Sequence, residues 1–150
     1  MWELETQGEE ETEALGEQLA SCLAPGDILA LYGELGAGKT CLVRGLARGL
    51  GVDESTVASP SFTLINEYEG RLPLAHLDCY RLRSPEDIEE LGLGDYFAGG
   101  RILVIEWAER IPDLLAEGVN ITIEWVDENR RRIRLEAEGE LGRRLEKCKG

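Results

Sequence analysis

The sequence has few basic residues, few prolines and a single histidine. Its 150 residues contain 16 Lys and Arg against 30 Asp and Glu, which gives a net charge of −14. A net negative charge of this size repels the phosphate backbone of nucleic acids, so the composition argues against non-specific nucleic-acid binding. The four cysteines, Cys22, Cys41, Cys79 and Cys148, show no close Cys-x-x-Cys spacing, and His76 alone is too little for a typical zinc site. We therefore expect a reduced protein with incidental thiols.

Long apolar runs are also lacking. No segment approaches the roughly 18 apolar residues of a membrane span, and the first residues have no basic and then apolar targeting pattern. The sequence thus predicts no membrane contact and a cytoplasmic location. A length of 150 residues with 43% hydrophobic and 31% charged residues is typical of one folded domain, so we expect a single domain over residues 1–150.

The charge that is present is unevenly distributed. Residues 1–20 contain seven Glu and no Lys or Arg, whereas residues 129–150 contain eight basic residues and four Glu. The acidic stretch is most simply a solvated helix face. If the protein contacts RNA or an acidic partner, we expect the contact at the basic segment, which comprises Arg130–Arg134 and Arg143–Lys149.

The hydrophobic pattern predicts an alternation of helices and strands. Helical spacing indicates helices over residues 10–23 and 41–50, and a Ser-Pro-Glu-Asp start predicts a further helix from Ser84. Apolar runs at 27–32 and 101–107 are typical of strands buried on both faces. Shorter strands are predicted at 63–68 and 72–78, and an antiparallel hairpin at 120–126 and 132–138. This order indicates a mostly parallel sheet between helices, with an antiparallel edge.

One glycine-rich segment carries a specific chemical signal. Gly33–Thr40 reads GELGAGKT and fits the phosphate-binding loop pattern G-x-x-x-x-G-K-[ST] at every fixed position, between a predicted strand and a predicted helix. Glycines allow such a loop to turn its backbone N–H groups toward phosphate oxygens. Lys39 supplies a positive charge, and the Thr40 hydroxyl suits Mg²⁺. The alternative is a glycine-rich turn that merely begins a helix.

Two acidic residues at predicted strand ends complete this hypothesis. A phosphate-binding loop needs carboxylates for its metal ion and attacking water at the ends of neighbouring strands, and Asp78 and Glu106 stand there. Either alone would also suit a solvated strand end. The sequence does not show which of the two residues binds the metal ion and which acts on the attacking water. The predicted fold class is therefore α/β: a P-loop NTPase-like three-layer sandwich with a mostly parallel central sheet, helices on both faces and a C-terminal antiparallel hairpin.

Further motifs resemble a known family. In order, Ser59-Pro60-Ser61-Phe62-Thr63-Leu64, Asn66-Glu67-Tyr68, His76-Leu77-Asp78-Cys79-Tyr80-Arg81-Leu82 and Ile105-Glu106-Trp107 are similar to the signature of the TsaE (YjeE) family, from about Thr12 to the hairpin. That family comprises small bacterial P-loop ATPases required to make threonylcarbamoyladenosine in tRNA. The resemblance implies that the chain binds and hydrolyses ATP with Mg²⁺, slowly alone and faster with TsaB and TsaD. It also implies that TsaD transfers the threonylcarbamoyl group. We expect any tRNA contact of this chain to be indirect or weak, through the basic segment if at all.

The resemblance also implies residue roles. Thr40 and Glu106 would hold the magnesium ion, Asp78 would be a further catalytic carboxylate beside Lys39, and Ser59–Thr63 would sense the nucleotide. The expected nucleotide-binding set is Thr12, near the adenine, with Gly33, Gly36, Ala37, Gly38, Lys39, Thr40 and Cys41. The sequence departs from the usual pattern at Cys41, Ser61 and Cys79. Cys41 has no hydroxyl for the α-phosphate, although its N–H remains.

Other residues and functions have competing interpretations. We expect His76, on an apolar strand, to be a packed and hydrogen-bonded core residue rather than a catalyst. Trp107 suits the core or a binding surface, and Arg81 suits a surface ion pair better than a clamp on the transition state. A small-molecule kinase and a non-hydrolytic, nucleotide-dependent binding switch are the alternative functions. A kinase usually needs a substrate-binding insertion, and the longest unassigned segment is Leu91–Arg101.

Overall fold

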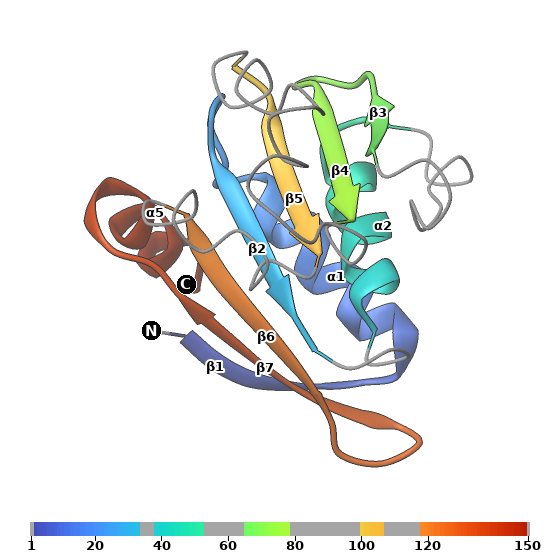
Figure 1. Ribbon diagram of the computed structural model, residues 1–150. Coiled ribbons are helices and arrows are strands. Elements are labelled where there is room, and N and C mark those ends of the chain that lie inside the picture. The colour runs from blue at the N-terminus through green and yellow to red at the C-terminus, as the bar shows by residue number, and fades with distance from the viewer. Residues whose placement is uncertain (1, 34–37, 53–64, 79–99, 107–117, 150) are drawn as a thin grey trace, which may run out of the picture.

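A single seven-stranded sheet organises the molecule. The computed structural model describes residues 2–33, 38–52, 65–78, 100–106 and 118–149. In these residues the strand order is β1-β7-β6-β2-β5-β4-β3, and helices pack against the sheet (Figure 1). In chain order the elements are β1 (Trp2–Gln7), α1 (Gly8–Ala20), β2 (Ile28–Tyr32), α2 (Lys39–Gly49), β3 (Ile65–Tyr68), β4 (Leu74–Asp78), β5 (Ile102–Glu106), β6 (Val119–Trp125), β7 (Arg130–Glu136) and α5 (Gly139–Lys149).

The centre of the sheet is parallel and its margins are antiparallel. Strands β6, β2, β5 and β4 run in the same direction, whereas β7 and β1 on one side and β3 on the other run against their neighbours. This confirms the predicted α/β class, with its parallel centre and its antiparallel hairpin, β6–β7. The helix predicted from Ser84 lies outside the described residues.

The two central strands are buried on both faces, as their apolar runs predict. Leu31 and Val104 belong to the core that also contains Leu42 of α2. Ala30 and Ile105, which point to the opposite face, are equally inaccessible to solvent. Because apolar side chains point both ways, β2 and β5 form the rigid middle of the sheet, and their carboxyl ends are fixed positions for a site.

Helices α1 and α2 pack side by side on one face of the sheet with their backbones in contact (Figure 1). Glycine makes this approach feasible: a Cβ at Gly45 would lie 2.7 Å from the Cα of Glu13, and one at Gly16 would lie 2.7 Å from the backbone nitrogen of Leu46. A larger residue at either position would force the helices apart. The close contact holds the beginning of α2 at the carboxyl end of β2.

Two elements were not predicted. Strand β1 pairs with β7 and is the outermost strand on that side of the sheet. Trp2 and Leu4 alternate with glutamates, which is typical of a strand, but the strongly acidic composition makes this alternation hard to recognise in the sequence. Helix α5 follows the hairpin in the basic segment, and its Leu141 and Leu145 join the core. Among the described residues, no helix is long and apolar enough to cross a membrane.

The cysteines differ from the expectation of incidental thiols. Cys22, just after α1, and Cys148, near the end of α5, form a disulfide that links positions 126 residues apart. Sequence spacing gave no sign of this pair, because folding alone brings the two helix ends together. Cys41 is a free thiol, and Cys79 lies outside the described residues.

The acidic and basic ends of the chain meet in the sheet. Glu3 and Glu5 of β1 are the cross-strand partners of Arg134 and Arg132 of β7, and each pair forms an ion pair, with N–O distances of 3.5 and 3.7 Å. The positive charge of these two arginines is thus balanced within the chain. We expected the acidic stretch to be a solvated helix face, but its first residues form strand β1, and the helix begins only at Gly8.

Candidate functional site

The predicted phosphate-binding loop follows the end of β2 and precedes the beginning of α2. Gly38 immediately precedes the helix with a φ of +113°, a conformation that residues with a Cβ rarely adopt. The first N–H groups of α2 therefore follow directly from the loop, at the positive end of the helix dipole. Such a helix start favours a bound anion.

The side chain of Lys39 extends across the base of this loop. Its Nζ donates a hydrogen bond to the carbonyl oxygen of Gly33 at 2.8 Å, and the residue is only 7% exposed. The ammonium group is thereby held between the two ends of the loop rather than in solvent. Thr40 follows in the first turn of α2 and is half-buried. The predicted phosphate ligands Gly33, Gly38, Lys39 and Thr40 thus lie together at one edge of the sheet.

The two predicted carboxylate positions lie side by side at the same edge. Asp78 ends β4 and Glu106 ends β5, and the two residues are direct partners in the parallel register. Glu106 also pairs with Leu31 of β2, two residues before Gly33, and is only 5% exposed. The sheet therefore brings the loop and both acidic residues together, which sequence reasoning anticipated.

The donors at this edge suit a magnesium ion. Mg²⁺ prefers oxygen ligands and commonly takes one or two from the protein and the rest from water and phosphate. The Thr40 hydroxyl and the Glu106 carboxylate are oxygen donors of this kind. Among the residues described here, no cluster of three or more His, Cys, Asp and Glu forms a closed metal cage. These oxygen donors would suit a metal ion that takes its other ligands from water and phosphate.

His76 lies on β4, farther from the carboxyl ends of the strands than the two acidic residues. It sits on β4, two residues before Asp78, and is fully buried, as we predicted for a core residue. The expected hydrogen bonding is wrong, however, because neither ring nitrogen has a hydrogen-bond partner within the described ranges. Its Nε2 lies 3.5 Å from Oε2 of Glu106.

Thr12 lies in α1 and contacts the end of β1. Its hydroxyl lies 2.7 Å from the Thr6 hydroxyl and donates to the Gly8 carbonyl at 3.3 Å, and the residue is 2% exposed. Its contact with a nucleotide stays a prediction. The same holds for sequence-predicted residues outside the described parts of the chain, namely Gly36, Ala37, Ser59–Thr63, Arg81 and Trp107.

Cys41, in the first turn of α2, is a half-buried thiol. Burial raises the pKa of Cys41, and the nearby carboxylates Glu9 and Glu13 raise it further, against the opposite effect of Arg44 and Arg131. The thiol is therefore protonated at neutral pH. It acts as a small apolar side chain beside the loop, and its backbone N–H remains the group suited to a phosphate.

Sequence reasoning missed the proximity of Arg131 to the loop. A Cβ built on Gly38 would lie 3.9 Å from Nε of Arg131, which reaches this point from β7. Its guanidinium donates to the Asp127 carbonyl at 2.8 Å and lies 5.8 Å from the ring centre of the exposed Trp125. The Gly8 N–H also donates to the Asn129 carbonyl at 2.7 Å, which ties the hairpin to the beginning of α1. No local sequence signal links residues so far apart.

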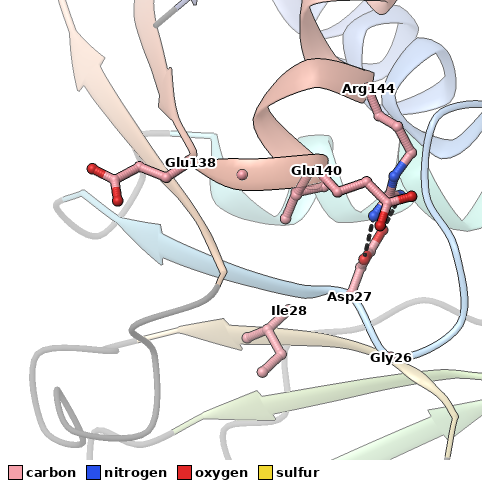
Figure 2. A pocket seen from close by; sticks show the side chains of 8 residues that line it. Gly26, Asp27, Ile28, Glu138, Glu140 and Arg144 are labelled. Carbon is pink, nitrogen blue, oxygen red and sulfur yellow. Dashed lines mark hydrogen bonds and ion pairs between the residues drawn. The ribbon is translucent and has the colours of Figure 1, made fainter.

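A hollow lies at the opposite edge of the sheet, between the beginning of β2 and α5. It has a volume of about 500 Å³, and Figure 2 shows Asp27 and Arg144 joined across it. Arg144 binds both carboxylate oxygens of Asp27, at 2.6 and 3.0 Å, and also the Cys22 carbonyl at 2.9 Å. Because these charged groups bind each other, the hollow is a structural junction between α5 and the sheet.

Comparisons with known proteins agree with this geometry. The family model "Threonylcarbamoyl adenosine biosynthesis protein TsaE" matches residues 6–134. The chain is 43% identical over 132 residues to a Bacillus subtilis protein and 45% identical over 131 residues to a Nostoc protein, both named tRNA threonylcarbamoyladenosine biosynthesis protein TsaE. These alignments cover 87% and 84% of this chain and 82% and 80% of the relatives.

A solved structure shows the same architecture. The crystal structure of Bacillus subtilis YdiB matches with a TM-score of 0.81 and 35% identity, over 99% of this chain and 93% of that one. The sequence match covers the loop, both carboxylate strands and most of the hairpin, and the structural match extends this likeness to almost the whole chain. The chain therefore belongs to the TsaE family.

Proposed function

We propose that this protein is a magnesium-dependent ATPase that takes part in the biosynthesis of threonylcarbamoyladenosine in tRNA. The observation that carries the proposal is the common edge of the sheet, where the Gly38–Lys39 helix start and the carboxylate of Glu106 meet. An anion-binding helix start beside acidic residues at strand ends is what the hydrolysis of a nucleoside triphosphate requires. The names of the relatives supply the pathway.

The residues at this edge divide the chemistry between them. The N–H groups of the loop and of the first turn of α2 bind phosphate oxygens, and Lys39 neutralises their charge. Thr40 and Glu106 would hold the magnesium ion, which supplies further positive charge against the triphosphate. Asp78, beside Glu106, orients the attacking water. Arg131 adds a positive charge next to Gly38 and faces the same ligand.

The proposal assigns the transfer reaction to other proteins. The family resemblance implies that TsaD carries out that step, with TsaB as its partner. The chain then acts as a nucleotide-driven component in the cytoplasm, slow alone and faster in the complex. Direct contact with tRNA is not part of the proposal, because Arg132 and Arg134 of the basic segment are already paired with glutamates.

The test compares ATP hydrolysis by the chain alone with hydrolysis in the presence of TsaB and TsaD. We expect release of ADP and phosphate in plain buffer with Mg²⁺, which a kinase without an acceptor would not give, and a faster rate with the partners. Glu106→Gln should lower the rate by about 100-fold or more, as is typical when a charged group at a reaction centre is removed.

Glu136→Gln is the matched control, since Glu136 is an exposed carboxylate at the far end of β7. This variant should hydrolyse ATP at the unaltered rate. Equal rates with and without the partners would contradict the role in the complex. Full cellular function of Glu106→Gln despite lost hydrolysis would instead favour the binding switch.

A further inference from the structure

The buried imidazole of His76 is the least explained polar group at the candidate site. Its exposed fraction is 0%, and both ring nitrogens lack a hydrogen-bond partner in the part of the chain that the structure describes. An unsatisfied buried polar group destabilises the folded state. Such a cost in a well-packed core calls for a compensating role.

The position of His76 in the sheet points to that role. On the face of the sheet that packs against α1 and α2, the neighbouring pairs of β4 and β5 are Leu74 with Ile102, then His76 with Val104, and then Asp78 with Glu106. His76 thus stands between the apolar core and the acidic edge. Diagonal neighbours on adjacent strands are within reach of each other when their side chains are long.

The contact between His76 and Glu106 indicates which ring nitrogen of His76 carries its hydrogen. Nε2 of His76 lies 3.5 Å from Oε2 of Glu106, an electrostatic contact that falls short of hydrogen-bond geometry in this structure. The side chain of Glu106 is 6% exposed and that of His76 is inaccessible, so water does not screen the contact. A lone pair on Nε2 would repel the carboxylate, and we therefore assign the hydrogen to Nε2.

We propose that His76 is a positioning residue for Glu106: its Nε2–H fixes the orientation of the Glu106 carboxylate and thereby sets the affinity of the site for a divalent cation. This inference rests on the proposed function, because it takes Glu106 as a ligand of the metal ion. Groups that hydrogen-bond a metal ligand from behind reduce its freedom, and removing them typically weakens metal binding 10- to 100-fold. His76 itself touches neither nucleotide nor metal ion.

Two polar variants separate positioning from packing. His76→Gln retains an N–H near the place of Nε2, whereas His76→Asn carries its amide near the place of Nδ1 and leaves Glu106 without a donor. His76→Leu removes the polar group and keeps most of the volume. The probes are ADP and Mn²⁺: ADP affinity is measured in EDTA, and Mn²⁺ affinity by electron paramagnetic resonance at saturating ADP.

We expect Mn²⁺ affinity to fall by about 10-fold or more in His76→Asn and His76→Leu and to stay within about 3-fold in His76→Gln. ADP affinity in EDTA should be unchanged in all three. If His76→Leu does not fold, the contrast between Gln and Asn carries the test. Equal Mn²⁺ affinities of the Gln and Asn variants would overturn the inference.

Glu106→Gln distinguishes this inference from the proposed function. Mn²⁺ affinity unchanged in Glu106→Gln would overturn the metal assignment itself, and the role of His76 with it. A loss in Glu106→Gln together with wild-type affinity in His76→Asn would overturn only the role of His76. In the double variant His76→Asn/Glu106→Gln, the histidine change should add less than about 2-fold, because a residue that acts through Glu106 has no effect once that carboxylate is gone.

Discussion

The two edges of the central sheet use their polar groups in opposite ways. At the carboxyl-end edge, a helix start, Lys39, the buried Glu106 and the position of Asp78 lie together. Nζ of Lys39 contacts the Gly33 carbonyl, and the Glu106 carboxylate contacts the His76 imidazole. At the amino-end edge, Asp27 and Arg144 bind each other through two hydrogen bonds, and the Cys22–Cys148 disulfide closes the same corner. Charged groups that bind each other hold a fold together, whereas a helix start with charged side chains at the carboxyl ends of parallel strands is suited to a ligand.

The largest effect is expected from opening the disulfide at the amino-end edge. Cys148→Ser should lower the free energy of unfolding by about 4 kcal/mol, because the cross-link closes a loop of more than a hundred residues in the unfolded chain. Denaturant unfolding under oxidising conditions measures it. Cys41→Ser is the control, since Cys41 is a free thiol and its replacement breaks no cross-link. An unchanged unfolding midpoint in Cys148→Ser would contradict the structural role of this corner.

The next effect concerns the ligand rather than the fold. Lys39→Met should weaken nucleotide binding by about 100-fold, or about 3 kcal/mol, because the variant loses a charged donor in a water-poor site. Titration with a fluorescent ADP analogue measures the affinity, and thermal unfolding without nucleotide should change little. Arg48→Met, at the far end of α2, is the matched control. Equal nucleotide affinities of the two variants would refute the assignment of the loop.

Removal of Arg144 tests the amino-end edge, where we expect a change in stability and none in nucleotide binding. Arg144→Met should lower the free energy of unfolding by about 2 kcal/mol, because it leaves the carboxylate of Asp27, only 10% exposed, without its charged partner. The ion pair is partly open to solvent, which keeps the loss below that of a fully buried pair. Nucleotide affinity should be unaltered. A variant as stable as the wild type but weaker in nucleotide binding would reverse the roles assigned to the two edges.

The smallest effect is expected at the exposed turn of the hairpin. The hydrogen bond from Arg130 and the backbone N–H of Asn129 lower the pKa of Asp127. A lowered pKa in the folded state contributes stability above about pH 4, and this contribution disappears as the pH falls through the folded-state value. Asp127→Asn should therefore lower the melting temperature slightly at pH 7 and not at all at strongly acidic pH. A pH-independent difference would assign the effect to the turn conformation instead.

Much of the carboxyl-end edge was readable from the sequence. The loop motif fixes a local geometry by its glycines and its lysine, and an apolar run followed by an acidic residue indicates a buried strand that ends at the site. Gly38, Lys39 and Glu106 lie where these patterns predicted. Parallel strands meet with their carboxyl ends at one edge, so local patterns sufficed to bring these residues together.

The contacts that sequence reasoning missed are all made between segments far apart in the chain. Arg131 reaches the loop, and Cys148 reaches Cys22. His76 lies 3.5 Å from Glu106 without forming the hydrogen bonds that we expected. No spacing or periodicity encodes such approaches, since they depend on how the helices and strands pack. β1 was missed for a different reason: its alternation is present, but six residues of strand are easily overlooked in an acidic stretch.

By itself, the sequence determined the place of the glycine-rich loop between β2 and α2, the parallel centre of the sheet and the positions of Asp78 and Glu106 at strand ends. Each of these depends on residues that are neighbours in the chain or on the fixed direction of parallel strands. The tertiary structure decided which charges are satisfied. It paired the acidic beginning of the chain with the basic hairpin, joined the ends of α1 and α5, and placed an unpartnered imidazole behind Glu106. These outcomes depend on burial and distance, and both arise only when the whole chain packs.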